Sequence, residues 1–263
     1  MTILDELADY ARQRVALCKQ QLPLTAIRQM ALSMPKGRFA FETALQKEDM
    51  AFICECKKAS PSKGVIAKQF PYLDIAKEYE QAGADAISVL TEPSRFLGND
   101  RYLEEITQKV TIPCLRKDFT VDEYMLYQAK LLGASAVLLI SSLLDASRLK
   151  EYLAICDEMG LSALVEVHDA AEIETALTAN ARIIGVNNRN LKDFTVDTNN
   201  SRKLRSLVPD HTIFVAESGV KTADDVQALR QAGVHAVLVG ETLMRAADKK
   251  AALLQLKARK SSF

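Results

Sequence analysis

The sequence lacks an excess of charge of either sign, since its 263 residues include 34 Lys plus Arg and 34 Asp plus Glu. Nucleic acids and anionic membranes attract basic surfaces, so this balance predicts neither as a partner. There is also no run of about 20 apolar residues that could cross a bilayer. The first residues, MTILDELADYARQR, are amphipathic and acidic, whereas a signal peptide is basic and then apolar. We therefore expect a cytoplasmic protein.

The five cysteines lack the pattern of a disulfide framework and contain no CxxC pair. We expect reduced thiols that pack as small hydrophobic residues. Cys54 and Cys56 alone have a spacing that could serve a metal, but the three histidines are scattered and no second cysteine pair follows. We therefore predict no metal site.

The chain repeats a unit of helix, glycine and strand. It is clearest in AGADAISVL, LGASAVLLI and AGVHAVLVG, where a glycine suited to a helix end precedes an apolar run. Thr120 with Glu123, and Thr222 with Asp225, have the spacing of capping boxes at helix starts. Such regular alternation indicates a parallel sheet with helical crossovers.

Eight strand-like runs can be counted, near residues 52–57, 86–91, 112–117, 135–140, 162–167, 183–188, 212–217 and 236–240. Eight units are the number that closes a (β/α)8 barrel, a TIM barrel. An open doubly wound sheet is the alternative, but SPSKG after the first strand is not its G-x-G-x-x-G turn. Residues 1–48 would form an N-terminal helical extension, with helices at 3–19 and 24–33 packed across one end, and residues 49–263 the single barrel domain.

The first strand, within FICECKKASPSKG, ends in two opposite charges, Glu55 and Lys57. Residues two apart on a strand point the same way, so both would project from one face and Cys54 and Cys56 from the other. In a covered sheet, inward charges must be hydrogen-bonded or meet a charged ligand. The strand end is therefore a candidate active site.

Other strand ends carry the same kind of side chain, and in such barrels the chemistry lies at the carboxyl ends. The third predicted strand ends at Lys117-Asp118-Phe119, the fifth at Glu166, the sixth at Asn187-Asn188-Arg189, the seventh at Glu217-Ser218-Gly219 and the eighth at Gly240-Glu241. Lysines and carboxylates gathered in one mouth would titrate together, which can supply both a proton donor and a proton acceptor near neutral pH.

Two of these ends also predict a phosphate site. Ser218-Gly219 and Gly240-Glu241 each precede an expected helix start, at Thr222 and Thr242. Glycines let backbone N–H groups approach an anion, and a helix start adds its positive dipole end. The alternative is that the glycines merely allow tight turns. We expect a small phosphate ester as ligand.

At this point the sequence resembles the indole-3-glycerol phosphate synthase family over nearly its whole length. The matching residues are Glu55-x-Lys57 with Ser60-Pro61-Ser62-Lys63-Gly64, Leu90-Thr91-Glu92 with Phe96 and Gly98, Leu115-Arg116-Lys117-Asp118-Phe119, Leu164-Val165-Glu166-Val167, Gly185-Val186-Asn187-Asn188-Arg189-Asn190-Leu191, Ala216-Glu217-Ser218-Gly219 and Leu238-Val239-Gly240-Glu241. The resemblance implies a (β/α)8 barrel with helices over its mouth. It also implies conversion of 1-(o-carboxyphenylamino)-1-deoxyribulose 5-phosphate to indole-3-glycerol phosphate, carbon dioxide and water, without a cofactor.

The resemblance also implies residue roles. Lys117 would be the general acid on the ketone oxygen, and Lys57 would meet the substrate carboxylate or donate a proton in the dehydration. Glu55 and Glu166 would position the lysines or accept a proton, and Asn187 would hold a hydroxyl. The remaining implied contacts are an apolar wall of Phe96, Phe119 and Leu138, further substrate contacts from Ser60, Arg189 and Glu217, and phosphate contacts from Ser218, Gly219, Gly240 and the backbone of Glu241.

Two other functions compete with this one. Phosphoribosylanthranilate isomerase is a neighbouring phosphate barrel, but it would be expected to use a Cys and Asp pair, whereas ExK stands at the first strand end here. A degenerate barrel kept for binding or assembly would be expected to lose charged strand ends, yet all are filled. Nothing in the sequence indicates the oligomeric state.

Overall fold

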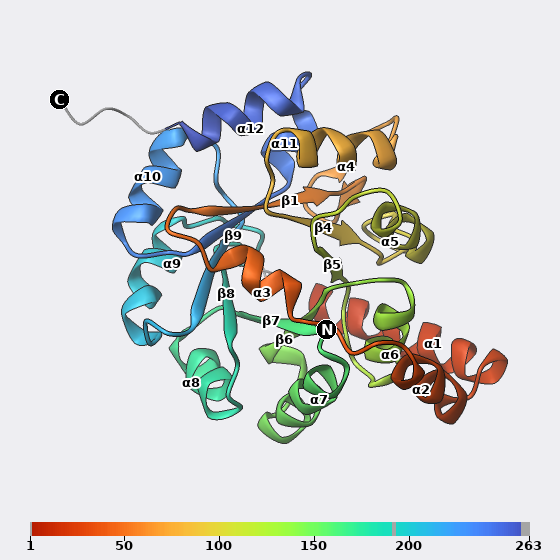
Figure 1. Cartoon of the computed structure of the whole chain (residues 1–263). Helices are drawn as coiled ribbons and strands as arrows, with labels where there is room; N and C mark the ends of the chain where they lie inside the picture. Colours follow the sequence, from red (N-terminus) through yellow and green to blue (C-terminus); the bar gives the residue numbers. More distant parts are fainter. Residues whose placement is uncertain (1, 191–192, 259–263) are drawn as a thin grey trace.

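In a computed structural model, which describes residues 2–190 and 193–258, eight parallel strands close into a barrel (Figure 1). The barrel strands are β1 (Ala51–Cys56), β4 (Ala86–Leu90), β5 (Cys114–Lys117), β6 (Ala136–Ile140), β7 (Ser162–Val167), β8 (Ile183–Asn187), β9 (Ile213–Glu217) and β10 (Ala236–Val239). They follow one another in chain order around the barrel, and β10 pairs with β1 to close it. The predicted (β/α)8 fold is confirmed.

Helices surround the barrel on its outside (Figure 1). They are α4 (Tyr72–Gln81), α5 (Asp100–Thr107), α6 (Tyr124–Leu131), α7 (Ala146–Met159), α8 (Ala170–Thr178), α9 (Asn199–Leu204), α10 (Ala223–Gln231), α11 (Glu241–Arg245) and α12 (Lys249–Lys257). Short 3-10 turns follow β6 and α9, at Ser141–Leu143 and Arg205–Leu207. Each connection thus returns the chain to the amino end of the barrel, so all the strand ends that carry polar residues meet at the other end.

The strands divide the core into two layers because successive side chains point to opposite faces. Ile53, Leu115 and Leu164 point into the barrel, while Phe52 and Cys54 pack between strands and helices. Glu55 follows the inward set and is almost fully buried. The predicted alternation of charge and cysteine on β1 is therefore present.

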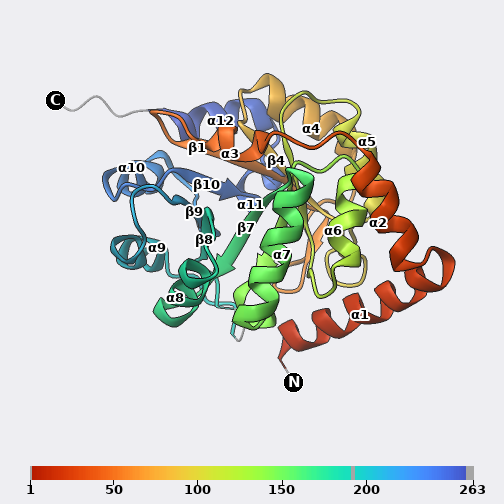
Figure 2. The same cartoon turned by 60° about the horizontal axis from the view of Figure 1, so that its bottom comes forward.

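Three helices precede β1, and they occupy different sides of the barrel (Figure 2). Helix α1 (Ile3–Gln21) crosses the carboxyl end, α2 (Leu24–Ser33) packs along α6, and α3 (Ala40–Leu45) crosses the amino end. Phe41 and Leu45 of α3 are fully buried in the same apolar cluster as the barrel interior. Of the two expected helices, α1 alone lies over the mouth. The expected boundary at residue 48 stays a prediction, with β1 beginning shortly after it.

Some local predictions fail. Helix α3 and the small hairpin β2 (Ala59–Ser60) with β3 (Gly64–Val65) were not expected from the sequence pattern. The capping box at Thr222 is present, but the one at Thr120 is wrong, because α6 begins later and Glu123 is its N-cap without a side-chain hydrogen bond. The last predicted helix start is one residue late, since α11 begins at Glu241 and Thr242 lies inside it.

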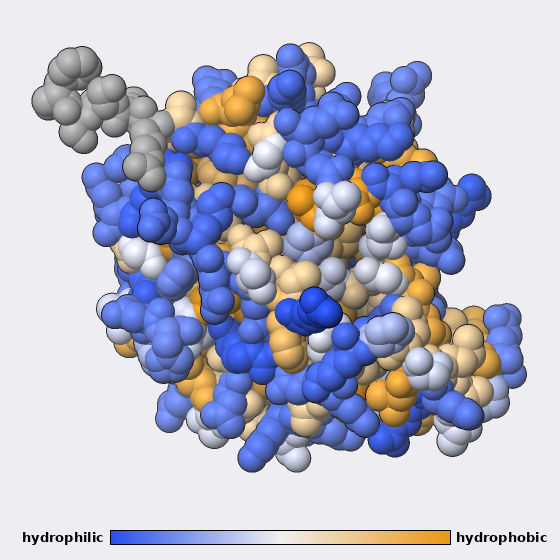
Figure 3. Space-filling model, viewed as in Figure 1, coloured by the Kyte–Doolittle hydropathy of each residue, from blue (hydrophilic) through white to orange (hydrophobic). Residues whose placement is uncertain are grey.

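The face that carries α3 is mainly hydrophilic, with scattered hydrophobic side chains (Figure 3). Among the described residues, none of the helices combines the length and the apolar character needed to span a bilayer. Leu191 of the sixth strand-end motif lies outside the described residues.

Candidate active site

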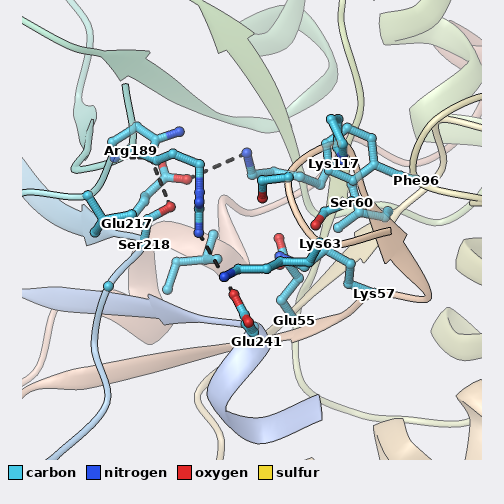
Figure 4. A pocket seen from close by; sticks show the side chains of 18 of the residues that line it. Glu55, Lys57, Ser60, Lys63, Phe96, Lys117, Arg189, Glu217, Ser218 and Glu241 are labelled. Carbon is cyan, nitrogen blue, oxygen red and sulfur yellow. Dashed lines mark hydrogen bonds and ion pairs between the residues drawn. The ribbon is translucent and has the colours of Figure 1, made fainter. Parts of the chain in front are cut away.

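A cavity of about 450 Å³ opens at the carboxyl end of the barrel, under α1. Its volume is in the range of small-molecule sites. All the site residues predicted from the sequence line it: Glu55, Lys57, Ser60, Phe96, Lys117, Phe119, Leu138, Glu166, Asn187, Arg189, Glu217, Ser218, Gly219, Gly240 and Glu241. Side chains from strands far apart in the sequence converge there (Figure 4). The barrel thus brings the predicted residues together, while their roles stay predictions.

Lys117, at the end of β5, lies between two carboxylates. Its Nζ is 2.9 Å from Glu166 Oε2 on β7 and 3.5 Å from Glu217 Oε2 on β9. Both glutamates are almost fully buried. Gly185, on β8 between them, leaves the space that Glu217 occupies, because a Cβ there would stand 2.3 Å from Glu217 Oε1. The ammonium group of Lys117 therefore forms ion pairs with two carboxylates inside the barrel.

The surroundings shift the pKa values of Lys117, Glu166 and Glu217 in different ways. Burial alone would lower the pKa of Lys117, but Glu166, Glu217 and Glu55 raise it. Burial would raise the pKa of Glu166, but Lys117 and His168 lower it below its usual value. For Glu217, burial together with Glu166 and Glu55 outweighs Lys117 and raises the pKa to about 7. Near neutral pH the site thus holds an ionised carboxylate beside one that can gain or lose a proton.

A second ion pair joins Glu55, at the end of β1, to Lys57. Gly240 after β10 makes room for it, because a Cβ at that position would lie 2.2 Å from Glu55 Oε2 and 3.0 Å from Lys57 Nζ. The amino group of Lys57 therefore reaches the end of the cavity where Gly240 exposes its backbone. The two lysines of the site have different partners: Lys57 pairs with Glu55, and Lys117 with Glu166 and Glu217.

Asn187, at the end of β8, is held at both ends of its amide. Its Nδ2 donates to Glu166 Oε1 at 3.2 Å, and its Oδ1 accepts from Ser218 Oγ at 2.9 Å and from the Arg189 backbone N–H at 3.0 Å. These bonds hold the side chain where it meets both the carboxylates and the loop after β9. A ligand hydroxyl could bind here without a change in the backbone.

The loops after β9 and β10 form a polar end of the cavity (Figure 4). Ser218 and Gly219 both have positive φ, 67° and 89°, so the loop turns sharply and presents its backbone to the cavity. Glu241 Oε1 accepts from Arg245 Nε at 3.0 Å, and its Oε2 lies 3.8 Å from Arg189 NH2. Two arginines therefore converge on one carboxylate beside backbone groups suited to an anion.

Opposite this end the cavity is apolar. The rings of Phe96 and Phe119 lie 6.0 Å apart between centroids, tilted by 42°. Leu138 and Ile140 of β6 belong to the same wall, and Leu7 of α1 covers it. An aromatic ring would fit against this wall, while its polar substituents reached the lysines.

The chain matches the model of one protein family, described as indole-3-glycerol phosphate synthase, over residues 4–256. The chain belongs to the indole-3-glycerol phosphate synthase family. It is similar to the synthase of Ruminiclostridium cellulolyticum, with 54% identity over 97% of this chain and 98% of the relative. It is also similar to that of Lachnoclostridium phytofermentans, with 50% identity over 97% and 98%. The family that the sequence motifs predict is thereby confirmed.

More distant solved structures share the synthase fold alone. A 3-hexulose-6-phosphate synthase from Salmonella typhimurium superposes with a TM-score of 0.65 at 15% identity, over 79% of this chain and 97% of that one. A thiamine phosphate pyrophosphorylase from Pyrococcus furiosus gives 0.58 at 19%, over 79% and 93%. Their likeness supports the barrel and carries no argument about activity.

Several residues that line this cavity were not predicted from the sequence. Lys63 belongs to the SPSKG motif but has no predicted role. Arg245 could have been found as the residue four after Glu241 on one helix face. Leu4 and Leu7 lie on α1, and the expected position of this helix over the mouth did not indicate which of its residues face the cavity. His168 lines a neighbouring polar cavity instead. It follows Glu166 by two positions and so points the same way, which the strand pattern could have indicated.

Asp118, one of the strand-end residues, has a different task. Its Oδ1 accepts from Arg14 NH2 of α1 at 2.7 Å, and its Oδ2 accepts from Thr91 Oγ1 at 2.5 Å. Arg116 lies 3.8 Å from it. The side chain is fully buried among these partners and fastens α1 to the barrel rim.

Proposed function

We propose that this cavity is where the chain performs the synthase reaction, with the reacting groups assigned as follows. The chain is a carboxy-lyase of tryptophan biosynthesis, as its family membership states. Its substrate carries an anthranilate ring, a ketone and a phosphate. The cavity offers an apolar wall, a lysine with carboxylates, and a polar loop end with two arginines.

The observation that carries the assignment is the position of Lys117 between Glu166 and Glu217. Attack of the electron-rich ring carbon on the ketone forms a carbon–carbon bond and places negative charge on the ketone oxygen. In our proposal the Lys117 ammonium stabilises that charge and transfers a proton to it. Carbon dioxide then leaves, the hydroxyl leaves as water with a donated proton, and one of the carboxylates accepts the carbon-bound proton whose loss makes the indole ring aromatic.

The other charged groups divide the remaining tasks in this proposal. Glu166 stays ionised and orients Lys117, while Glu55 orients Lys57, which meets the substrate carboxylate or gives the proton that leaves with water. Glu217, whose pKa is raised to about 7, can change its protonation state during turnover. Asn187 holds a substrate hydroxyl.

The phosphate is assigned to the loops after β9 and β10. Backbone N–H groups of Ser218, Gly219, Gly240 and Glu241 and the hydroxyl of Ser60 would surround it, with Arg189 nearby. The ring is assigned to the wall of Phe96, Phe119 and Leu138. The place of the side-chain-free Gly219 and Gly240 in the cavity lining and the tilted phenylalanine pair support these assignments.

Replacing Lys117 tests the assignment. We expect Lys117→Ala to lower kcat by about a hundredfold or more, since general acid catalysis is worth roughly 10²–10⁴. The measurement is indole fluorescence on the carboxyphenylamino substrate, with circular dichroism to confirm folding and Lys117→Met as a second variant of closer volume.

Lys58→Ala is the matched control, because Lys58 neighbours Lys57 in sequence and does not line the cavity. A rate for Lys117→Ala equal to that of the control would contradict the assignment. Turnover of phosphoribosylanthranilate in place of the synthase substrate would favour the isomerase.

We also propose that the protein works in the cytoplasm on this small phosphorylated molecule, without nucleic acid or membrane. The even charge balance and the five free cysteines support this.

A further inference from the structure

His168 lies directly after β7 and points toward the same side as Glu166. Its Nε2 is 3.7 Å from Glu166 Oε1, is closed off from solvent and has no hydrogen-bond partner among the described residues. A buried polar atom without a partner costs free energy, so its position calls for an explanation.

The other side of the imidazole ring is held by Glu172 of α8. Glu172 Oε2 lies 3.2 Å from His168 Nδ1 and also accepts the His168 backbone N–H at 2.7 Å. Ser142 Oγ donates to the second oxygen, Oε1, at 2.6 Å. The ring therefore stands in a fixed orientation between two carboxylates.

This arrangement determines which protonation state suits the ring. With a proton on Nδ1 for Glu172, a neutral ring would turn the lone pair of Nε2 toward the oxygen of Glu166. A charged ring presents an N–H to each carboxylate. In agreement, although burial would lower the pKa of His168, its bonds to Glu172 and the charge of Glu166 raise it.

We propose that His168 is a positioning residue of the synthase reaction: as an imidazolium held by Glu172, it orients Glu166 and offsets part of its negative charge. The inference rests on the proposed role of Glu166 as the partner of Lys117. Because the negative charge of Glu166 is partly offset, it holds the proton of Lys117 less strongly. Lys117 then gives this proton to the substrate more readily.

Several charged groups face the ring besides these. Glu217 acts on it through space from β9. The polar cavity beside His168 is also lined by charged groups of α1 and of the loops after β7 and β8, namely Asp5, Asp169, Arg189 and Asp197. Most are anionic, so they favour the imidazolium as well.

His168→Gln and His168→Asn test the proposal together. Gln keeps a neutral donor near the position of Nε2, whereas Asn keeps one near Nδ1 alone. We expect kcat to fall about tenfold for Gln and further for Asn, with KM changed less than threefold, because the residue does not bind substrate. His211→Gln is the control, since His211 is exposed and far from the cavity lining.

The pH profile separates positioning from a merely structural role. If the imidazolium is the active form, kcat of the unaltered protein falls as the pH rises through the pKa of His168, above its ordinary value of about 6.5. His168→Gln must lose this descending limb, and Glu172→Gln must shift it to lower pH by removing the charge that stabilises the imidazolium.

A His168→Gln profile with the limb unchanged, or a kcat equal to that of His211→Gln, overturns the inference. Glu166→Gln distinguishes this from failure of the proposed function. If Glu166→Gln is as active as the unaltered protein, the role of Glu166 itself is wrong. If it is impaired while both His168 variants are normal, the error lies with His168 alone. Thermal unfolding of every variant confirms the fold.

Discussion

At the scale of single residues, Glu92 is a buried carboxylate that organises the loop carrying Phe96. Its Oε1 accepts from the Ser94 N–H at 2.7 Å, and its Oε2 accepts from the N–H groups of Arg95 and Phe96 at 2.8 and 3.0 Å. The Phe96 carbonyl in turn accepts from the Ala59 N–H, beside Ser60. One carboxylate thus shapes the apolar wall without lining the cavity itself.

Glu92→Gln should therefore raise KM by about three- to tenfold and change kcat less. Gln presents an NH₂ group where the Arg95 and Phe96 donors need an acceptor, and an unpaired buried donor costs about 1–3 kcal/mol. Steady-state kinetics would measure this, with Glu104→Gln on the exposed side of α5 as the control. Equal KM values for the two variants would show that Glu92 does not position the wall.

At the scale of elements, α1 is attached to the rim by charges. Arg14 bonds to Asp118 at 2.7 Å, and Lys19 bonds to Asp122 at 2.7 Å. Burial would raise the pKa of Asp118, but Arg14 and Arg116 lower it, so this attachment weakens only in strong acid. Because Leu4 and Leu7 of α1 line the cavity, we expect the attachment to affect substrate binding at the proposed site.

Arg14→Met should loosen α1 while the barrel stays folded. The pair is partly exposed on the arginine side, so we expect a cost of about 1–2 kcal/mol, less than for a fully buried pair. Amide hydrogen exchange in α1 should become about tenfold faster or more, and KM should rise. Arg12→Met is the control, because Arg12 pairs with Asp9 on the exposed face of the same helix. Unchanged exchange in α1 would contradict the attachment.

The elements also show what could be predicted from sequence. Apolar runs in the sequence predict every barrel strand within about two residues, because hydrophobic patterning reflects burial directly. Helix α3 has six residues and begins after Phe39, whose φ is +52°, so no periodic pattern or capping residue announces it. The strands β2 and β3 have two residues each and exist through contacts with each other.

The same limit applies to the site. The strand ends predicted which residues gather at the mouth, because a parallel barrel places every carboxyl end together. They could not predict that Lys117 pairs with Glu166 and Glu217, or that Asp118 turns outward to Arg14. Those choices depend on strand register and on which residue of each strand faces inward.

At the scale of the whole molecule, the site reduces stability at neutral pH. Glu217 has a pKa raised to about 7, whereas the unfolded chain has the ordinary value of 4.5. Between these values the folded state binds a proton that the unfolded state does not, so stability falls as the pH rises through this range. Above this pH range, the full loss in the free energy of unfolding remains.

Glu217→Gln should remove this cost. Relative to the unaltered protein it should gain stability between pH 4.5 and pH 8, on the order of 1–3 kcal/mol. Urea unfolding across that range would measure the gain, with the exposed Glu158→Gln as the control. Parallel stability curves for the variant and the unaltered protein would show that Glu217 carries no such proton. Since Glu217 neighbours Lys117, the same variant should lose activity.

Helix α3 closes the amino end of the barrel, which determines where molecules can enter and leave. Phe41 and Leu45 fill that end with apolar side chains, and the described cavity opens at the opposite end beside α1. In the proposed assignment, the substrate enters and the phosphorylated product, carbon dioxide and water leave through that same opening. The cavity therefore has to release its products before it can bind the next substrate molecule. Helix α1, which lies over the opening, is placed where its motion could limit the rate of product release.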